Sequence, residues 1–273
     1  MKKNTNDNLY KFSIQTPWQF IFVVIIYLVG ATSVPNDLFI FIFGESLVGS
    51  AISAFIVKSL CCILPIWLIK EIKCEKILTL RGFLSGLLII IPFLLVAINN
   101  FPILPMINGE CKVENEVSFW EWVSYLLAVL AGAALEEFAF RGLVFPTLMR
   151  KFEGHKYRDF LAVLVSSAAF GLVHAFNLLA GASPLSVLMQ IGYSLLIGGM
   201  CAIAFLKTGN FYHAVILHFV FNIGGMLFNY GMVNGEIWTL QTIVITAALA
   251  VAVIIYALCI LFICNKEKLS DKL

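Results

Sequence analysis

Residues 118–150 read SFWEWVSYLLAVLAGAALEEFAFRGLVFPTLMR. The run is almost entirely apolar and exceeds the roughly 17–25 residues that one membrane-spanning helix needs, so we expect a helix that crosses the bilayer and projects beyond it. Two adjacent glutamates and an arginine interrupt the run at positions 136, 137 and 141. A charge at the bilayer centre costs about 2.5–3.5 kcal/mol, which makes these three side chains candidates for a function.

The composition of the whole chain is that of a membrane protein. Of its 273 residues, 61% are hydrophobic and only 12% are charged, and the mean hydropathy is +0.96. Soluble domains carry about 25% charged residues. The net charge of +2 and the lack of a basic tail argue against nucleic acid as a partner. We therefore expect membrane lipid around the protein and no nucleic-acid partner.

Eight apolar runs are long enough to cross a membrane. They predict an all-α, polytopic membrane protein, a bundle of about eight transmembrane helices around an intramembrane polar cavity. No repeat, low-complexity segment or linker divides the chain, so we treat residues 1–273 as a single transmembrane domain. The first run resembles a signal peptide, but seven further runs follow it and we expect a retained helix. The runs cover residues 17–34, 47–69, 83–99, 118–150, 159–180, 185–206, 211–230 and 238–264.

The loop charges predict the orientation of the bundle. With eight spans, every basic loop falls on the same side, and the positive-inside rule makes that side cytoplasmic. Both termini are then cytoplasmic. The basic residues are Lys2, Lys3 and Lys11; Lys70, Lys73, Lys76 and Arg81; Arg150, Lys151, Lys156 and Arg158; Lys207; and Lys266, Lys268 and Lys272.

Helical geometry distinguishes the two glutamates. Residues four apart share a face of a helix, whereas neighbours point about 100° apart. Glu137 and Arg141 are therefore expected to form an ion pair, which is either structural or part of a site. Glu136 projects in another direction and has no local partner, so it needs a partner on another helix or stays protonated.

Two further pairs place polar side chains on one helical face. Phe170 and His174 are four residues apart in the fifth run, and His218 and Asn222 are four apart in the seventh. A carboxylate beside a histidine can deprotonate a water, and a histidine beside an asparagine can donate hydrogen bonds to an oxyanion. This combination suits hydrolysis of an amide bond in a shielded cavity.

Other polar residues in the apolar runs have simpler interpretations. We expect His213 and Gln190 to form hydrogen bonds between helices, and His155 to lie on the solvated surface. Lys58 either extends its ammonium towards the membrane surface or pairs with a carboxylate such as one of the glutamates. A zinc site is the competing hypothesis, because two histidines and a glutamate are sufficient ligands. No HExxH spacing occurs, so we expect no cofactor, with zinc possible but disfavoured.

These segments resemble three motifs of a known family. EEFAFR at 136–141, FGLVH at 170–174 and HFVFN at 218–222 are similar to the EExxxR, FxxxH and HxxxN motifs of the CPBP family. That family comprises the type II CAAX prenyl endopeptidases and the Abi, bacteriocin-processing membrane proteases. The resemblance covers residues of about 120–230, which we take as the catalytic core.

The resemblance implies a membrane protease that depends on glutamate and not on metal. It implies that Glu136 acts as the general base on water and that His174 helps to hold this water. His218 and Asn222 would form the oxyanion hole. Glu137, Arg141 and Phe170 would support the site.

The substrate remains open at this point. The resemblance implies a peptide or a lipidated, membrane-associated protein, either a prenylated CAAX-type substrate or a bacteriocin or signal peptide. The short Lys- and Asn-rich N-terminus favours a multi-pass protein of a bacterial plasma membrane. The alternatives are a non-catalytic bacteriocin self-immunity or scaffold protein that binds a peptide with the same cluster, and a proton-coupled transporter. The oligomeric state cannot be predicted.

Overall fold

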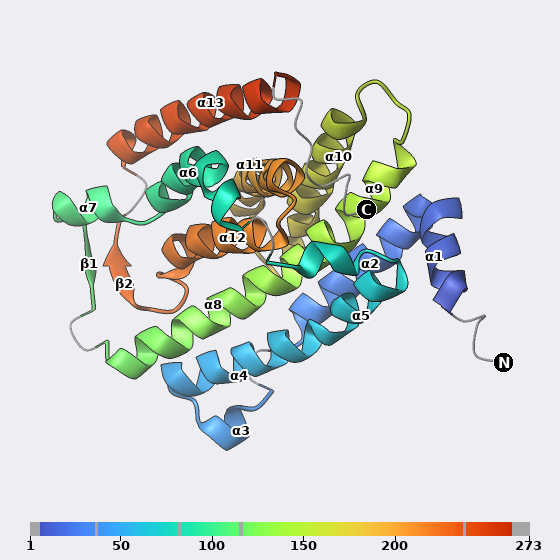
Figure 1. Cartoon of the computed structure of the whole chain (residues 1–273). Coiled ribbons are helices and arrows are strands. Elements are labelled where there is room, and N and C mark those ends of the chain that lie inside the picture. The colour runs from blue at the N-terminus through green and yellow to red at the C-terminus, as the bar shows by residue number, and fades with distance from the viewer. Residues whose placement is uncertain (1–5, 36–37, 81–82, 115–116, 237–238, 264–273) are drawn as a thin grey trace.

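The computed structural model describes residues 6–35, 38–80, 83–114, 117–236 and 239–263 (Figure 1). Lys2, Lys3, Arg81, Lys266, Lys268 and Lys272, which contribute to the predicted orientation, lie outside these ranges. The α-helices are α1 (Asn6–Gln15), α2 (Pro17–Ser33), α3 (Ile40–Phe43), α4 (Leu47–Cys61), α5 (Ile63–Glu71), α6 (Phe83–Asn99), α7 (Ile103–Ile107), α8 (Phe119–Ala139), α9 (Phe145–Lys151), α10 (Arg158–Val173), α11 (Pro184–Thr208), α12 (Phe211–Met226) and α13 (Leu240–Phe262).

Three shorter helical elements and two strands complete the fold. The 3₁₀ turns are η1 (Glu75–Leu78) and η3 (His174–Leu178), and η2 (Phe140–Val144) is a π turn. Strands β1 (Cys111–Val113) and β2 (Val233–Gly235) pair antiparallel, with Cys111 opposite Gly235. The sequence pattern did not indicate these strands, because each is only three residues long.

The all-α, polytopic membrane architecture is confirmed, but the count of eight spans is not. Among the described residues, five helices are long and apolar enough to cross a membrane: Leu47–Glu71, Phe119–Lys151, Arg158–Leu178, Pro184–Thr208 and Leu240–Phe262. A sixth is reached if Asn8–Gln15 and Pro17–Ser33, which are bent by 109°, form one span. The runs at Phe83–Asn99 and Phe211–Met226 form helices too short to pass the same test.

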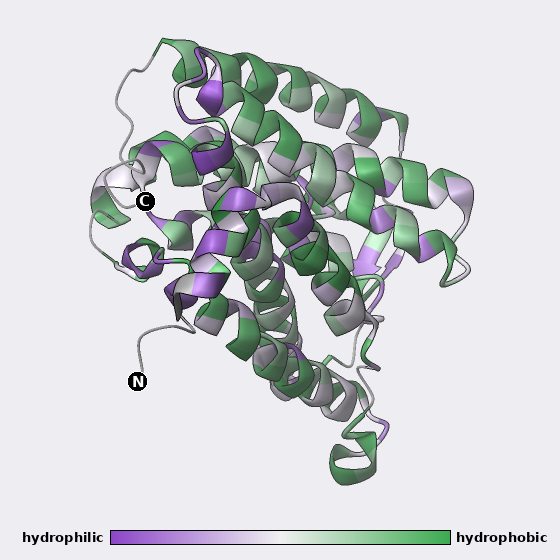
Figure 2. Cartoon of the chain, turned by 90° about the vertical axis from the view of Figure 1, so that its right-hand side faces the viewer, coloured by the Kyte–Doolittle hydropathy of each residue, from purple (hydrophilic) through white to green (hydrophobic). Residues whose placement is uncertain are grey.

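Hydrophobic residues predominate along the helices, as the green ribbon in Figure 2 shows. Leu84 and Leu88 on α6 are each 78% exposed, and α13 is buried over only 6% of its apolar window. Exposed apolar surface of this extent is typical of helices that face lipid.

The long helix that begins with α8 lies at the centre of the bundle (Figure 1). Its window is 56% buried, and the Phe119–Lys151 stretch is continuous, as residues 118–150 predict. A capping box starts it, because the Ser118 hydroxyl accepts from the Glu121 amide and the Glu121 carboxylate accepts from the Ser118 amide. Small residues let α4 pack closely against it, since Ala51 and Ala54 form a cluster with Ala128.

The π turn η2 follows the glutamates directly. Pro146 stands five residues after Arg141 and has no backbone N–H to donate, and its ring disfavours a regular α-helical turn before it. The Phe145 amide accordingly bonds the Phe140 carbonyl, five residues back. Gly142 lies within this turn, where a Cβ atom would come within 2.4 Å of Ile69 Cδ1, so its lack of a side chain lets α5 approach.

Candidate active site

A buried ion pair forms the centre of the site. Arg141 Nη1 donates to Glu137 Oε1 at 3.0 Å, and both side chains are 0% exposed. The predicted pair between residues four apart is thus confirmed. The same Glu137 oxygen also lies 2.8 Å from His218 Nδ1. Because a carboxylate accepts hydrogen bonds, we assign a proton to Nδ1.

Arg141 joins three helices. Its Nη2 donates to the Gly198 carbonyl of α11 at 2.5 Å, and its guanidinium lies 5.0 Å from the centre of the Phe170 ring of α10. A guanidinium over an aromatic face is stabilised by the ring quadrupole. Arg141 therefore fixes α8, α10 and α11 relative to one another and holds Glu137 in place.

Glu136 differs from its neighbour in exposure. Its side chain is 22% exposed, whereas that of Glu137 is 0% exposed. Glu136 Oε2 lies 3.7 Å from His218 Nε2, which is beyond a direct hydrogen bond. Its carboxylate makes no hydrogen bond with any residue that the structure describes. One imidazole thus faces both glutamates, Glu137 through Nδ1 and Glu136 through Nε2.

Phe170 is the aromatic centre against which the other motif side chains pack. Its ring makes edge-on contacts with Phe140 at 4.9 Å, His218 at 5.4 Å and His174 at 5.8 Å between centroids. A Cβ atom at Gly198 would lie 3.1 Å from this ring, so the glycine leaves the space that the ring fills. The contact between Phe170 and His174 agrees with their predicted shared face.

The remaining two motif residues lie at the edge of this cluster. His174 stands where α10 changes into the 3₁₀ turn η3, and the charges of Glu136 and His218 act on it. Asn222 lies one helical turn after His218 on α12 and is partly exposed. Its amide forms no hydrogen bond with the described part of the chain, so its predicted role has no contact in this structure.

The structural residues expected from sequence are in place. His213 is fully buried, with Nδ1 2.8 Å from Thr208 Oγ1 and Nε2 2.9 Å from the Phe83 carbonyl. Gln190 accepts from Asn177 at 2.7 Å and so links α11 to η3. Both are the hydrogen-bonding residues between elements that the sequence predicts.

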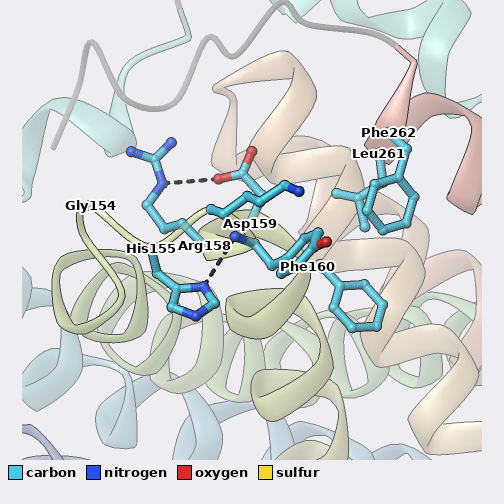
Figure 3. Close-up of a pocket in the computed structure, with 9 residues that line it drawn as sticks. Gly154, His155, Arg158, Asp159, Phe160, Leu261 and Phe262 are labelled. Atoms are coloured by element: carbon cyan, nitrogen blue, oxygen red, sulfur yellow. Dashed lines mark hydrogen bonds and ion pairs between the residues drawn. The ribbon is translucent and has the colours of Figure 1, made fainter.

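His155 lies on the surface, away from the motif residues, as expected. It lines a cavity of about 510 Å³ between the start of α10 and the end of α13 (Figure 3). There its Nδ1 accepts from the Tyr157 amide, and Arg158 pairs with Asp159 at 3.0 Å. None of the seven candidate residues lines this cavity.

Among the residues that the structure describes, no three His, Cys, Asp or Glu side chains gather closely enough to hold a metal ion. The nitrogen and oxygen atoms that a zinc ion would need instead face one another, as the contact between His218 and Glu137 illustrates.

Comparison with known proteins finds one similar family. Residues 118–224 match the family model described as Type II CAAX prenyl endopeptidase Rce1-like. The chain is similar to that family over this segment. The match, together with the apolar helices, indicates a multi-pass membrane protease. No curated protein and no solved structure matches it. The match runs from the cap of α8 into α12 and so contains every candidate residue.

Two groups near the site, the Gly198 carbonyl and Tyr193, were not predicted from sequence, whereas Lys58 was predicted with two alternative roles. The role of the Gly198 carbonyl could not be predicted, because every residue has a backbone carbonyl. Tyr193 and Lys58 both experience the charge of Glu136, from α11 and α4 respectively. A cation inside an apolar run was the one available signal for Lys58. Of the two alternatives for Lys58, the pairing with a glutamate is not formed: Nζ donates to the Ala31 and Thr32 carbonyls.

Proposed function

We propose that this membrane protease cleaves a peptide bond with a water activated by Glu136. The observation that carries the proposal is the contrast within the acid pair. The Glu137 carboxylate is fully buried and contacts Arg141 and His218. The adjacent Glu136 carboxylate is partly exposed and forms no hydrogen bond with the described residues. A general base must reach its water, and only Glu136 is accessible to one.

The neighbouring groups have roles that follow from their positions. His174 helps to hold the water beside Glu136. His218 presents Nε2 to the reacting carbonyl, while the Glu137 carboxylate at Nδ1 stabilises the ring when it carries a second proton. Protonated in this way, Nε2–H donates to the developing oxyanion, and the Asn222 amide supplies a second donor.

The proton balance of the reaction is simple. Glu136 removes a proton from water as the oxygen attacks the carbonyl carbon, and a tetrahedral oxyanion forms. The proton then moves from Glu136 to the departing amine as the carbon–nitrogen bond breaks. The products are a carboxylic acid and an amine, which exchange a proton to become a carboxylate and an ammonium, and Glu136 is again ionised.

The family indicates a prenylated or peptide substrate within the membrane. We propose a membrane-associated substrate of CAAX type, with a bacteriocin or signal peptide as the alternative within the same chemistry. We further propose that residues 120–230 form the catalytic core of one transmembrane domain. The location that we propose is a bacterial plasma membrane, with both termini in the cytoplasm.

The test is the replacement Glu136→Gln in the purified protein in lipid nanodiscs. It keeps the size of the side chain and removes the base, so cleavage should fall by roughly 10²–10⁴-fold. Glu153→Gln is the matched control, since this exposed glutamate lies in the turn after α9. Cleavage is followed by mass spectrometry of released peptides, which also names the bond. A fully active Glu136→Gln protein would refute the mechanism.

A further inference from the structure

Lys58 carries a positive charge within the span Leu47–Glu71. It is half-buried, and no acidic side chain among the described residues lies within the 4.0 Å of an ion pair. Its Nζ donates to the Thr32 carbonyl at 3.2 Å and to the Ala31 carbonyl at 3.4 Å, at the last turn of α2. An ammonium has three donors, so one N–H remains for another acceptor.

The packing of α4 on α8 places Lys58 beside the approach to Glu136. Both helices run in the same direction (Figure 1), and Ala54 belongs to one packed cluster with Ala51 and Ala128. Farther along, Ile69 lies against Gly142. Lys58 comes four residues after Ala54 on α4, and Gly132 comes four residues after Ala128 on α8. We therefore infer that Lys58 lies opposite Gly132. Gly132 is one turn before Glu136, which corresponds to about 6 Å along the axis.

The space at this level is open. A Cβ atom at Gly132 would have no atom within 4 Å, although the small residues before it are packed against α4. Lys58 and Glu136 lie near enough for their charges to interact. Three features therefore follow one another along the axis of α8 on its α4 side. They are a cation without an acidic partner among the described residues, an open space and the proposed base.

We propose that Lys58 binds a carboxylate of the peptide substrate and so sets where the chain is cut. This inference rests on the proposed function, because it locates the carboxylate relative to the water activated by Glu136. An extended peptide rises about 3.3 Å per residue, so about two residues span the axial distance between Glu136 and the level of Lys58. The carboxylate is then a chain end or an acidic side chain at that distance.

The substrate carboxylate would replace solvent or lipid headgroups as the third partner of the ammonium. Charge-assisted hydrogen bonds are shorter and about twice as strong as neutral ones, and partial burial weakens competition from water. The two α2 carbonyls direct the ammonium and carry no full charge, so they do not neutralise it. Lys58 is thus a specificity-determining residue and takes no part in bond cleavage.

The experiment compares three fluorescent peptides, each with a farnesylated cysteine followed by three residues. One ends in a free carboxylate, one in an amide, and one in an amide after a terminal glutamate. Cleavage is measured with wild type, and binding with Glu136→Gln protein, in nanodiscs of neutral phosphatidylcholine. We expect the free acid to bind and react roughly tenfold to hundredfold better than the amide. If the peptide with the terminal glutamate binds and reacts as well as the free acid, an acidic side chain is a sufficient source of the carboxylate.

The variants separate recognition from structure. Lys58→Met should remove the preference for acid over amide, and Lys58→Arg should keep it. Lys58→Gln can still donate to the α2 carbonyls and lacks the charge, so it tests the charge if Lys58→Met does not fold. Lys70→Met, on an exposed lysine of α5, is the matched control. A structural role alone would lower the cleavage of all three peptides equally.

The outcomes of the two proposals differ. Equal handling of acid and amide in both binding and cleavage, or an unchanged preference in Lys58→Met and Lys58→Gln, overturns the role of Lys58. Wild-type cleavage by Glu136→Gln overturns the mechanism and leaves the binding comparison valid.

Discussion

His218 Nδ1 lies 2.8 Å from Glu137 Oε1, in a contact between α12 and α8 across 81 positions of the chain. Since Arg141 donates to the same oxygen, Glu137 is held from two sides. The other nitrogen of the ring faces Glu136. The imidazole therefore lies between the buried acid and the partly exposed one, and the two adjacent glutamates have different surroundings.

Glu137 should matter for stability far more than Glu136 does. Glu137→Gln leaves the fully buried Arg141 without its counter-ion, which we expect to lower the free energy of unfolding by about 3–5 kcal/mol. Glu136→Gln should change it by less than about 1 kcal/mol, because this side chain is partly exposed and unbonded. Chemical unfolding in mild detergent measures both.

A double variant checks the origin of that loss. If the unpaired charge is the cause, Glu137→Gln combined with Arg141→Met should be less destabilising than the sum of the two single changes. Additive losses would show that the two side chains act independently.

Substitutions at Gly132 test whether the open space beside it is needed for cleavage. Gly132→Ala should raise the free energy of unfolding by up to about 1 kcal/mol, because alanine favours helix and meets no atom there. Gly132→Leu should fill the open space one turn before Glu136 and reduce cleavage while the protein stays folded. Circular dichroism and the peptide cleavage assay are measured on the same samples.

Gly224→Ala is the contrasting glycine variant. Its Cβ atom would come within 2.5 Å of the Asn100 backbone oxygen, so we expect a loss of about 1–3 kcal/mol. Wild-type cleavage by the Gly132→Leu protein would argue against a substrate path on this face of α8.

His213 should behave as a structural residue although it is a histidine near the site helices. His213→Ala removes the bonds to Thr208 and the Phe83 carbonyl, and we expect it to lower the free energy of unfolding by about 1–3 kcal/mol. Cleavage per folded molecule should be unchanged, whereas His218→Ala should abolish it. Equal losses of activity in both folded variants would contradict this division.

Alkaline pH should weaken the connection that follows α5. Burial raises the pKa of the Cys74 thiol from 9.0 to about 11, although the adjacent Arg150 guanidinium opposes this shift. Between these values the unfolded thiol has lost its proton and the folded one has not. The free energy of unfolding therefore falls as pH rises, by up to about 1.4 kcal/mol per unit. Cys74→Ala should remove this part of the slope in unfolding measured between pH 8 and 11.

A slope that is the same in wild type and Cys74→Ala would show that the thiol ionises equally in both states. The bond from Arg150 Nη1 to the Ile72 carbonyl, at 2.9 Å, is retained in the variant, so the comparison isolates the thiol.

Contacts within one helix were the part of the site that the sequence could predict. Residues four apart must share a face, which is why the bond between Glu137 and Arg141 and the contact of Phe170 with His174 could be anticipated. The apolar runs likewise predicted most helices. They did not predict how many cross the membrane, because the runs around α6 and α12 become helices of only 17 and 16 residues.

Contacts between helices could not be predicted in the same way. The approach of His218 to Glu137 depends on how α12 packs against α8, and periodicity along one helix carries no information on this. The sequence left open whether Lys58 extends to the membrane surface or pairs with an acid, and in the fold it donates to the carbonyls near the end of α2. Carbonyls without hydrogen-bond partners at the end of a helix attract a nearby cation. The sequence does not show which helix end will lie near Lys58, because this depends on the packing of the helices.

The π turn at Phe140–Val144 sets the rotational phase between two parts of one helix. A turn of this kind holds one residue more than an α-helical turn, so everything before it is rotated by about 100° relative to a regular helix. Removing one residue from the turn would restore the regular helix and, with α9 anchored, swing the acid pair away from His218. The direction in which the two glutamates point therefore depends on the one extra residue in the π turn. Deletion of one residue there, with every motif side chain retained, should abolish activity.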